Sequence, residues 1–333
     1  SPMKSREIHL NAYLKGAPKT ENYSLVETEL PAPAEGQVTV RNLYISVDPY
    51  MRGRMSGIKT YIDPFKLGAV MEGGAVGEVV ESRFEGLKPG DHVMSMLGWR
   101  EAYTASGKAV QKIDTRLLPP QAFLGIAGLT GLTAYVGIKR CLDLQPGETM
   151  WMSAGAGAVG SAGIQFAKAM GANVIATAGG AEKCEYVKSI GADHAIDYKA
   201  TDDLTAAIRA VAPQGVETYF ENVGGTHFTA ALNTLKQYGR MAACGMIQRY
   251  NDAEPAMIPD NLTFIVGKSL RIQGFIVSDH LNIQPEFIKD LSTWMMAGKI
   301  TPAETILEGI EKAPEAFTGL FSGLNKGKML VKI

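Results

Sequence analysis

The sequence predicts an α/β protein of two domains, a compact barrel-like β domain followed by a doubly wound parallel sheet. First, residues 24–118 consist of short, valine-rich segments separated by turn residues, without strong helical periodicity. Second, apolar segments of strand length alternate with segments of helical period over residues 149–275. Third, a glycine-rich turn at 155–160 stands where the first strand of this series meets its first helix.

The β domain is predicted from segments that have the composition and length of strands. The turn sequences LPAPAEG and LKPGD intervene between these segments. Strands at this spacing favour a barrel-like all-β fold. The predicted strands are 37–47, 74–81 and 90–97. We expect this domain to span 1–123 and to be completed by 298–333, with the second domain at 124–297.

The second domain is predicted from the βα alternation that follows connecting helices at 123–140. Its strands are expected at 150–152, 173–178, 194–197, 216–220, 240–243 and 270–275. Its helices are expected at 158–170, 181–190, 203–212 and 225–236. Two more helices near 285–297 and 312–322 precede a final strand at 327–333, which we expect to return to the first domain.

The composition excludes several classes of function. A chain of 333 residues with 46% hydrophobic and 20% charged residues is typical of a globular protein with two cores. A net charge of −1 gives no electrostatic reason to expect nucleic acid or an anionic membrane as a partner. Three widely spaced cysteines offer no disulfide framework, and no apolar run could span a membrane. We therefore expect a cytoplasmic protein that acts on small molecules.

The glycine turn predicts a dinucleotide site. Gly155, Gly157 and Gly160 match G-x-G-x-x-G, in which the glycines allow a tight turn, close approach of a pyrophosphate and close packing of helix on strand. The helix that follows presents unpaired N–H groups and a positive dipole end to an anion. A glycine turn that serves packing alone is the alternative, and the βα series around the motif favours the dinucleotide.

The second strand of the series indicates which dinucleotide is bound. Folds specific for NAD usually carry an acidic residue there that holds the ribose 2′-hydroxyl, whereas this chain has Gly179, Gly180 and Ala181. Lys183 could supply the positive charge that a 2′-phosphate requires. The prediction is NADPH rather than NADH, although Lys183 could equally be a solvated helix lysine.

No metal site is expected from the sequence. Zinc requires three or four converging Cys, His or carboxylate ligands, and the histidines of this chain are isolated from one another and from the cysteines. Hydride chemistry supplied by a nicotinamide is then the simplest interpretation. The five histidines are His9, His92, His194, His227 and His280.

Several segments together resemble one family over nearly the whole chain. They resemble the zinc-independent medium-chain dehydrogenases/reductases, specifically the NADPH-dependent alkenal double-bond reductases, leukotriene and prostaglandin reductases, and curcumin-reductase-like enzymes. The segments are VDPYMRGRM at 47–55, GLTGLTAY at 128–135, GAGAVG at 155–160, ENVGG at 221–225, CGMIQRYN at 244–251 and NKGKMLVKI at 325–333.

The resemblance implies a GroES-like catalytic domain, a Rossmann domain that binds NADPH or NADP, and a homodimer. Zinc-dependent relatives carry a cysteine near 47–50, a histidine near 72 and a lobe with four cysteines after 90–93. Here DPYM, MEGG and an uninterrupted 94–103 stand in those places, which again predicts no metal.

The resemblance also assigns cofactor residues. Lys183 resembles the lysine that binds the 2′-phosphate, but the usual GSDEK reads GGAEK here, so an assisting serine is missing. Tyr198 resembles the tyrosine beside the adenosine phosphate, Asn222 and Asn325 resemble asparagines at the nicotinamide half, and Gly327 would allow close approach. The full predicted set is Gly155, Ala156, Gly157, Val159, Gly160, Lys183, Tyr198, Asn222, Cys244, Tyr250, Phe275, Asn325 and Gly327.

The predicted reaction is reduction of the C=C bond of an α,β-unsaturated aldehyde or ketone. Hydride addition at the β-carbon leaves an enolate that needs a hydrogen-bond donor at oxygen. Tyr250 is the candidate catalytic residue, because a phenol of pKa about 10 can donate at neutral pH. The ribose hydroxyl could serve instead. Tyr50 and Met51 are expected to line the substrate pocket, although Tyr50 could be a core aromatic.

Two other functions fit the same residues. A quinone reductase of this fold would share the glycine motif and the absence of zinc ligands, while the segments at 47–55 and 244–251 favour the alkenal group. A catalytically silent NADPH-binding protein is the alternative from another class, since dehydrogenase folds also host non-enzymatic roles.

Overall fold

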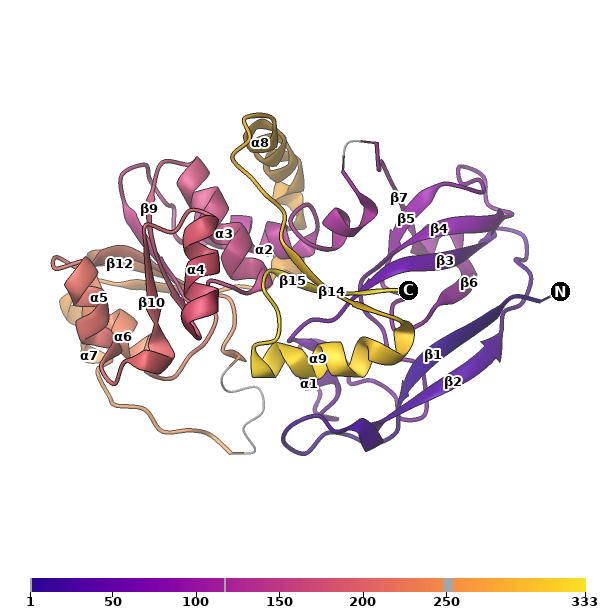
Figure 1. The fold of residues 1–333 in the computed structure, drawn as a ribbon, viewed down its shortest axis with the longest axis horizontal. Coiled ribbons are helices and arrows are strands. Elements are labelled where there is room, and N and C mark those ends of the chain that lie inside the picture. Colours follow the sequence, from indigo (N-terminus) through magenta and orange to yellow (C-terminus); the bar gives the residue numbers. More distant parts are fainter. Residues whose placement is uncertain (1, 117, 248–253) are drawn as a thin grey trace. The chain divides into compact units, whose positions relative to one another are not determined.

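The computed structural model describes residues 2–116, 118–247 and 254–333. The chain forms two compact units (Figure 1). The first unit comprises Ser1–Leu124, Thr305–Leu324 and Met329–Ile333. The second unit comprises Gly125–Glu304 and Asn325–Lys328.

The first unit is built on antiparallel strands. Strands β1 and β2 pair with each other, and a seven-stranded sheet has the order β14-β15-β3-β4-β5-β7, with β6 also paired to β3. The long strand β3 pairs antiparallel with β4, β6 and β15, so the C-terminal strand lies beside the strand at the centre of this sheet. The strands are β1 (Lys4–Leu10), β2 (Tyr23–Glu29), β3 (Gln37–Ser46), β4 (Ala75–Ser82), β5 (His92–Ser95), β6 (Ala102–Ser106), β7 (Gln111–Ile113), β14 (Glu304–Glu308) and β15 (Lys328–Lys332).

The core of the first unit collects apolar residues from its strands and from the helices α1 (Met51–Arg54) and α9 (Ala313–Ser322). Trp99 is fully buried and contacts Phe317 of α9 edge-on, with the ring centroids 6.3 Å apart. Burying large aromatic side chains is among the strongest contributions to a core of this size.

The second unit holds a six-stranded sheet in the order β10-β9-β8-β11-β12-β13, and every paired neighbour is parallel. Numbered from β8, this is the order 3-2-1-4-5-6 of a doubly wound dinucleotide-binding sheet. The strand order reverses between β8 and β11. The strands are β8 (Thr149–Met152), β9 (Asn173–Ala178), β10 (His194–Asp197), β11 (Val216–Glu221), β12 (Leu235–Ala243) and β13 (Arg271–Gly274).

Helices connect these strands, as a parallel sheet requires. The connecting helices are α3 (Ala158–Ala169), α4 (Ala181–Ser189), α5 (Leu204–Val211), α6 (Thr226–Thr234) and α7 (Thr263–Gly267), while α2 (Leu129–Val136) precedes β8 and α8 (Gln284–Met296) follows β13. Shorter turns of helix are η1 (Thr20–Asn22), η2 (Gly107–Ala109), η3 (Pro120–Leu124), the π-turn η4 (Gly137–Cys141), η5 (Tyr198–Ala200), η7 (Val277–Ile283) and η8 (Ile310–Lys312). In the described part of the chain, no helix is both long and apolar enough to cross a membrane.

The predicted fold class is confirmed, with local corrections. The strands predicted at 173–178 and 194–197 coincide with β9 and β10. The helix predicted to run to 236 ends at Thr234, because Leu235 begins β12 and pairs with Val216 of β11. The prediction placed the start of that strand at 240, five residues too late.

Candidate functional site

The glycine turn joins β8 to α3 and requires glycine at two positions for packing. The Gly155 N–H donates to the Thr177 carbonyl of β9 at 2.9 Å, which ties the turn to the neighbouring strand. A Cβ on Gly155 would lie 2.9 Å from Ala176 Cβ, and one on Gly160 would lie 2.1 Å from the Ala154 carbonyl oxygen. Side chains at these two positions would therefore push the helix away from the sheet.

Gly157 differs, because its outer side is more open. A Cβ there would meet only the Ala154 carbonyl oxygen, at 3.3 Å. Gly327 forms a bridge with Gly157, and its N–H donates to the Ala156 carbonyl at 2.7 Å. Gly327 has φ +69° and would place a Cβ 2.3 Å from the Ala303 carbonyl oxygen, so only glycine fits there.

Helix α3 begins directly after Gly157, with the half-buried Val159 in its first turn. Its first intrahelical bond runs from the Ser161 N–H to the Gly157 carbonyl at 2.9 Å. The N–H groups that precede Ser161 in the first turn have no intrahelical acceptor and point toward the N-terminal end. This end of α3 can therefore bind an anion such as a pyrophosphate.

Asn222 lies at the carboxyl end of β11, beside the end of β8, where the strand order reverses. Its backbone N–H donates to Ser153 Oγ at 2.8 Å and its side-chain Nδ2 donates to the Ser153 carbonyl at 2.9 Å. Ser153 Oγ in turn donates to the Phe220 carbonyl at 2.8 Å. Ligands of doubly wound sheets bind in the crevice at this switch point.

Asn325 is buried, and its Nδ2 donates to the Gly327 carbonyl at 2.8 Å. It therefore braces the tight segment that contacts the glycine turn. A contact of Asn325 or Asn222 with the nicotinamide stays a prediction.

Glu221 is a fully buried carboxyl at the end of β11 that the sequence reasoning did not single out. Tyr219 donates its hydroxyl to Oε2, and the Val223 N–H donates to the same oxygen at 3.1 Å. Within the described residues, Oε1 has no hydrogen-bond partner. Burial raises the pKa of Glu221. Glu221 is the first residue of the ENVGG segment, and this motif is the sequence feature that could have identified it.

Cys244 and Phe275 follow β12 and β13 at the same edge of the sheet. The Cys244 N–H donates to the Glu221 carbonyl at 3.0 Å. Burial, together with the neighbouring Cys141, raises the pKa of the Cys244 thiol to about 12, so the thiol stays protonated near neutral pH. Phe275 contacts Phe220 edge-on, with the ring centroids 6.3 Å apart. A contact of Cys244 or Phe275 with the cofactor stays a prediction.

The carboxyl end of β9 carries the residues predicted to bind a 2′-phosphate. The hydroxyl oxygen of Tyr198 lies 3.1 Å from the position that a Cβ on Gly179 would take. The Asp197 carboxylate also lies at this edge, where it accepts a hydrogen bond from the Gly180 backbone N–H at 3.0 Å. The ring of Tyr198 packs edge-on against His227, at 5.1 Å between centroids.

Lys183 stands in the first turn of α4 and is half-buried. Burial lowers its pKa, and so do the ammonium groups of Lys199 and Lys326. This end of the sheet is therefore positively charged, as expected for a site that binds a phosphate.

The predicted substrate residues lie in different surroundings. Met51 is fully buried in the core of the first unit, and Tyr50 is half-buried against the same core, where burial raises its pKa. Tyr250 lies outside the described residues. The roles of these three residues stay predictions.

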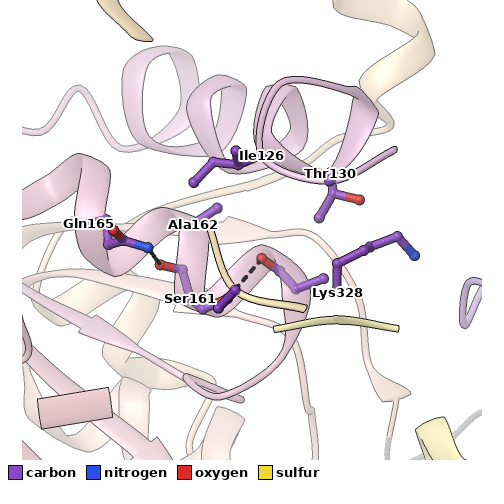
Figure 2. Close-up of a pocket in the computed structure, with 9 residues that line it drawn as sticks. Ile126, Thr130, Ser161, Ala162, Gln165 and Lys328 are labelled. Carbon is purple, nitrogen blue, oxygen red and sulfur yellow. Dashed lines mark hydrogen bonds between the residues drawn. The ribbon is translucent and has the colours of Figure 1, made fainter. Parts of the chain in front are cut away.

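A small cavity is lined by residues of helices α2 and α3 and of the segments around them (Figure 2). Its volume is about 10 Å³, the size of a single water molecule rather than of a substrate. Gln165 lines the cavity and forms two hydrogen bonds with the backbone of Thr301. Its Nε2 donates to the Thr301 carbonyl at 2.9 Å, and its Oε1 accepts the Thr301 N–H at 2.6 Å. The other lining residues are Gly125, Ile126, Thr130, Ala158, Ser161, Ala162, Ala303 and Lys328.

Comparison with known proteins places this fold and site in a family. The family described as "N-terminal domain of oxidoreductase" matches residues 6–113, and that described as "Zinc-binding dehydrogenase" matches 158–295. The NADPH-dependent curcumin reductase of Escherichia coli is 38% identical over 96% of this chain and 94% of its own length. The NADP(+)-dependent 2-alkenal reductase of Nicotiana tabacum is 38% identical over 99% of this chain and 97% of its own length.

The chain belongs to the zinc-independent medium-chain dehydrogenases/reductases. A solved structure of CurA from Vibrio vulnificus in complex with NADPH matches this chain with a TM-score of 0.93 at 36% identity, covering 98% of each chain. Throughout the described parts of the chain, no group of three or more His, Cys, Asp or Glu side chains is placed to hold a metal ion.

Proposed function

We propose that the protein reduces the C=C bond of α,β-unsaturated aldehydes and ketones with NADPH. The observation that carries the proposal is a glycine turn and a basic strand end in a chain that is 38% identical, almost end to end, to a curcumin reductase and a 2-alkenal reductase. Both of those relatives are named as NADPH- or NADP-dependent.

The residues of the second unit fit NADPH. Gly157 leaves room beside the N-terminal end of α3, where a pyrophosphate can approach the backbone. At the end of β9 stands Gly179 in place of an acidic residue, with Lys183 and the Tyr198 hydroxyl nearby. A carboxylate at that position would repel a 2′-phosphate, whereas an ammonium attracts it.

The proposed mechanism gives the chain positioning and electrostatic tasks. NADPH, when bound, supplies the hydride, which is added to the β-carbon of the substrate. Tyr250 donates a hydrogen bond to the carbonyl oxygen, where negative charge develops as the enolate forms. A proton from solvent reaches the α-carbon and completes the saturated carbonyl product. Tyr50 and Met51 are proposed to shape the part of the site that receives the alkene.

The test is turnover of NADPH with a panel of activated alkenes. The purified protein is mixed with NADPH and a short 2-alkenal or enone, and both the loss of the reduced nicotinamide and the saturated product are measured. The matching saturated aldehyde is the control. Turnover with quinones alone would favour a quinone reductase, and NADPH binding without any turnover would favour a silent binding protein. Either result would overturn the proposal.

The role of Tyr250 has its own test. A Tyr250→Phe variant is expected to lower kcat by about 100-fold, the effect of losing one donor to a developing oxyanion. NADPH affinity is measured alongside, because Tyr250 also belongs to the predicted cofactor set and a loss of binding must be separated from a loss of kcat. An unchanged kcat would remove Tyr250 from the mechanism and leave the carbonyl to the ribose hydroxyl.

We also propose that the protein works as a homodimer in the cytoplasm. Strand β13 forms one edge of the six-stranded sheet and all four of its residues are exposed, so a second copy can pair with it. The thiols of Cys141, Cys184 and Cys244 are free, as is usual in a reducing compartment.

A further inference from the structure

Two lysines besides Lys183 converge on the carboxyl end of β9. Lys199 comes from η5, which directly follows β10, and Lys326 comes from the segment between α9 and β15. Lys199 is 16 positions and Lys326 is 143 positions from Lys183 in the sequence, and the fold of the second unit brings all three together. Of these three lysines, sequence similarity assigned only Lys183 to the cofactor.

Lys199 reaches over the glycine that takes the place of the usual acidic residue. Its Nζ lies 3.3 Å, and its Cε 3.0 Å, from the position that a Cβ on Gly179 would take. The Tyr198 hydroxyl oxygen lies 3.1 Å from the same position. An ammonium and a phenol therefore meet above a residue without a side chain.

Lys326 enters the cluster through an ion pair with Glu182. Glu182 directly precedes Lys183 in the first turn of α4, so its carboxylate stands close to the expected 2′-phosphate. The Glu182 side chain is 81% exposed and that of Lys326 is 39% exposed. Exposed ion pairs contribute little to stability, so the energy of this pair does not explain why a lysine stands here.

The electrostatics of the cluster call for an anion. Three ammonium groups that repel one another meet at this place, and two carboxylates stand beside them: Glu182 pairs with Lys326, and Asp197 accepts the backbone N–H groups of Gly180 and Lys199. The lowered pKa of Lys183 is the expected consequence of burial and of its two lysine neighbours. A phosphate that carries nearly two negative charges and three acceptor oxygens would satisfy all three donors.

We propose that Lys199 and Lys326, together with Lys183, bind the 2′-phosphate of NADPH, and that Lys326 makes the site selective for this phosphate by neutralising Glu182. Without Lys326, the Glu182 carboxylate would repel the 2′-phosphate and could accept a hydrogen bond from the ribose 2′-hydroxyl of NADH. Selectivity for NADPH thus depends on a lysine 143 positions away in the chain from the one that similarity identifies. The proposal rests on the NADPH part of the proposed function and is independent of the alkene.

The test measures binding alone, without an alkene. Dissociation constants of NADPH, NADH and adenosine 2′,5′-bisphosphate are determined by calorimetry for the full chain and its variants. Lys199→Gln and Lys326→Gln are each expected to weaken NADPH and the bisphosphate by about tenfold and NADH by less than about twofold, as for one charge-assisted hydrogen bond. Lys188→Gln is the matched control, since Lys188 lies on α4, the helix that carries Lys183, and pairs with Glu185.

The Glu182 carboxylate provides a second, independent readout. In the Lys326→Gln background, Glu182→Gln should restore about threefold of the lost NADPH affinity, because the repulsive charge is then gone. Lys326→Arg should keep most of the affinity, which separates lost charge from a damaged fold. Equal weakening of NADPH and NADH by Lys326→Gln would show a merely structural lysine, and unchanged NADPH affinity in both glutamine variants would leave Lys183 alone. Either result would overturn the proposal.

These outcomes are distinct from failure of the proposed reaction. A protein that binds NADPH with this selectivity but reduces no alkene would contradict the reductase assignment and leave the lysine site standing. A protein that reduces alkenes with NADPH while the glutamine variants bind it normally would do the reverse.

Discussion

His227 shows how a single buried residue links the core to the cofactor edge. It is 1% exposed in α6, and its Nε2 lies 3.0 Å from Thr177 Oγ1. Trp151 Nε1 donates to the same hydroxyl oxygen at 3.1 Å. Burial lowers the pKa of His227 to about 4, so its imidazole is neutral in the folded protein near neutral pH.

This histidine predicts a loss of stability in mild acid. The unfolded chain binds a proton at His227 below a pKa of about 6.5, while the folded protein resists protonation down to about pH 4. The stabilisation is thus complete above pH 6.5 and is lost as the pH falls toward 4, amounting to about 3 kcal/mol as an upper bound. Urea unfolding at a series of pH values measures it. His227→Gln should flatten the slope in this window, and an equal slope in the variant would contradict the assignment.

Two glycines of the turn predict opposite phenotypes. Gly160→Ala places a methyl group 2.1 Å from a backbone oxygen and should cost about 1–3 kcal/mol of stability. Gly157→Ala meets one atom at 3.3 Å, so the fold should tolerate it while NADPH affinity falls by about tenfold. Thermal unfolding and NADPH titration of both variants separate the two effects. A stable Gly160→Ala protein would show that the turn can relax.

At the scale of single residues, the sequence predicted those features that depend on residues close together in the chain. The glycine turn and Lys183 are short-range patterns with a known physical task. The pairing of Lys326 with Glu182 spans 144 positions, and the burial of Glu221 depends on the strands around it. Neither could be inferred from neighbouring residues, because tertiary contacts create both environments.

At the level of elements, predicted boundaries failed where pairing overrode local propensity. The end of α6 was predicted two residues late because the sequence LKQ continues a helical composition. In the structure Leu235 pairs with Val216, and Tyr238 adopts a left-handed φ of 63° within β12. Strands β1, β2, β6, β7 and β14 were not predicted, since short and partly exposed strands give weak periodic signals.

Helix α5 offers a test of local design. The Asp203 side chain accepts the Ala206 N–H at 3.0 Å and caps the helix, which buries Leu204 and Ile208. Asp203→Ala should lower the free energy of unfolding by about 1 kcal/mol. The neighbouring Asp202→Ala removes the same charge without the cap and is the control. Equal losses in urea unfolding would mean that charge rather than capping matters.

At the scale of the whole molecule, residues 325–333 contribute to both units. Asn325–Lys328 belongs to the second unit, where Gly327 contacts the glycine turn and Lys326 reaches Glu182. Met329–Ile333 belongs to the first unit, where β15 pairs with β3. Because one short segment contributes to both, substitutions there can alter cofactor binding and the antiparallel sheet together.

The exposed edge of the parallel sheet predicts that two copies of the protein form a dimer. Strand β13 has β12 as its neighbour on one side, and Ile272 in it is 37% exposed. A second copy paired along this edge would cover the backbone groups that an open edge leaves available for aggregation. Sedimentation equilibrium should therefore give twice the chain mass of 35.7 kDa for the native protein and a smaller mass for Ile272→Lys. Ile306→Lys changes a residue of similar exposure on β14 and should remain dimeric. A native protein of single-chain mass, or an Ile272→Lys dimer as tight as the native one, would place the interface elsewhere or exclude it, because a buried lysine at a paired edge strongly opposes association.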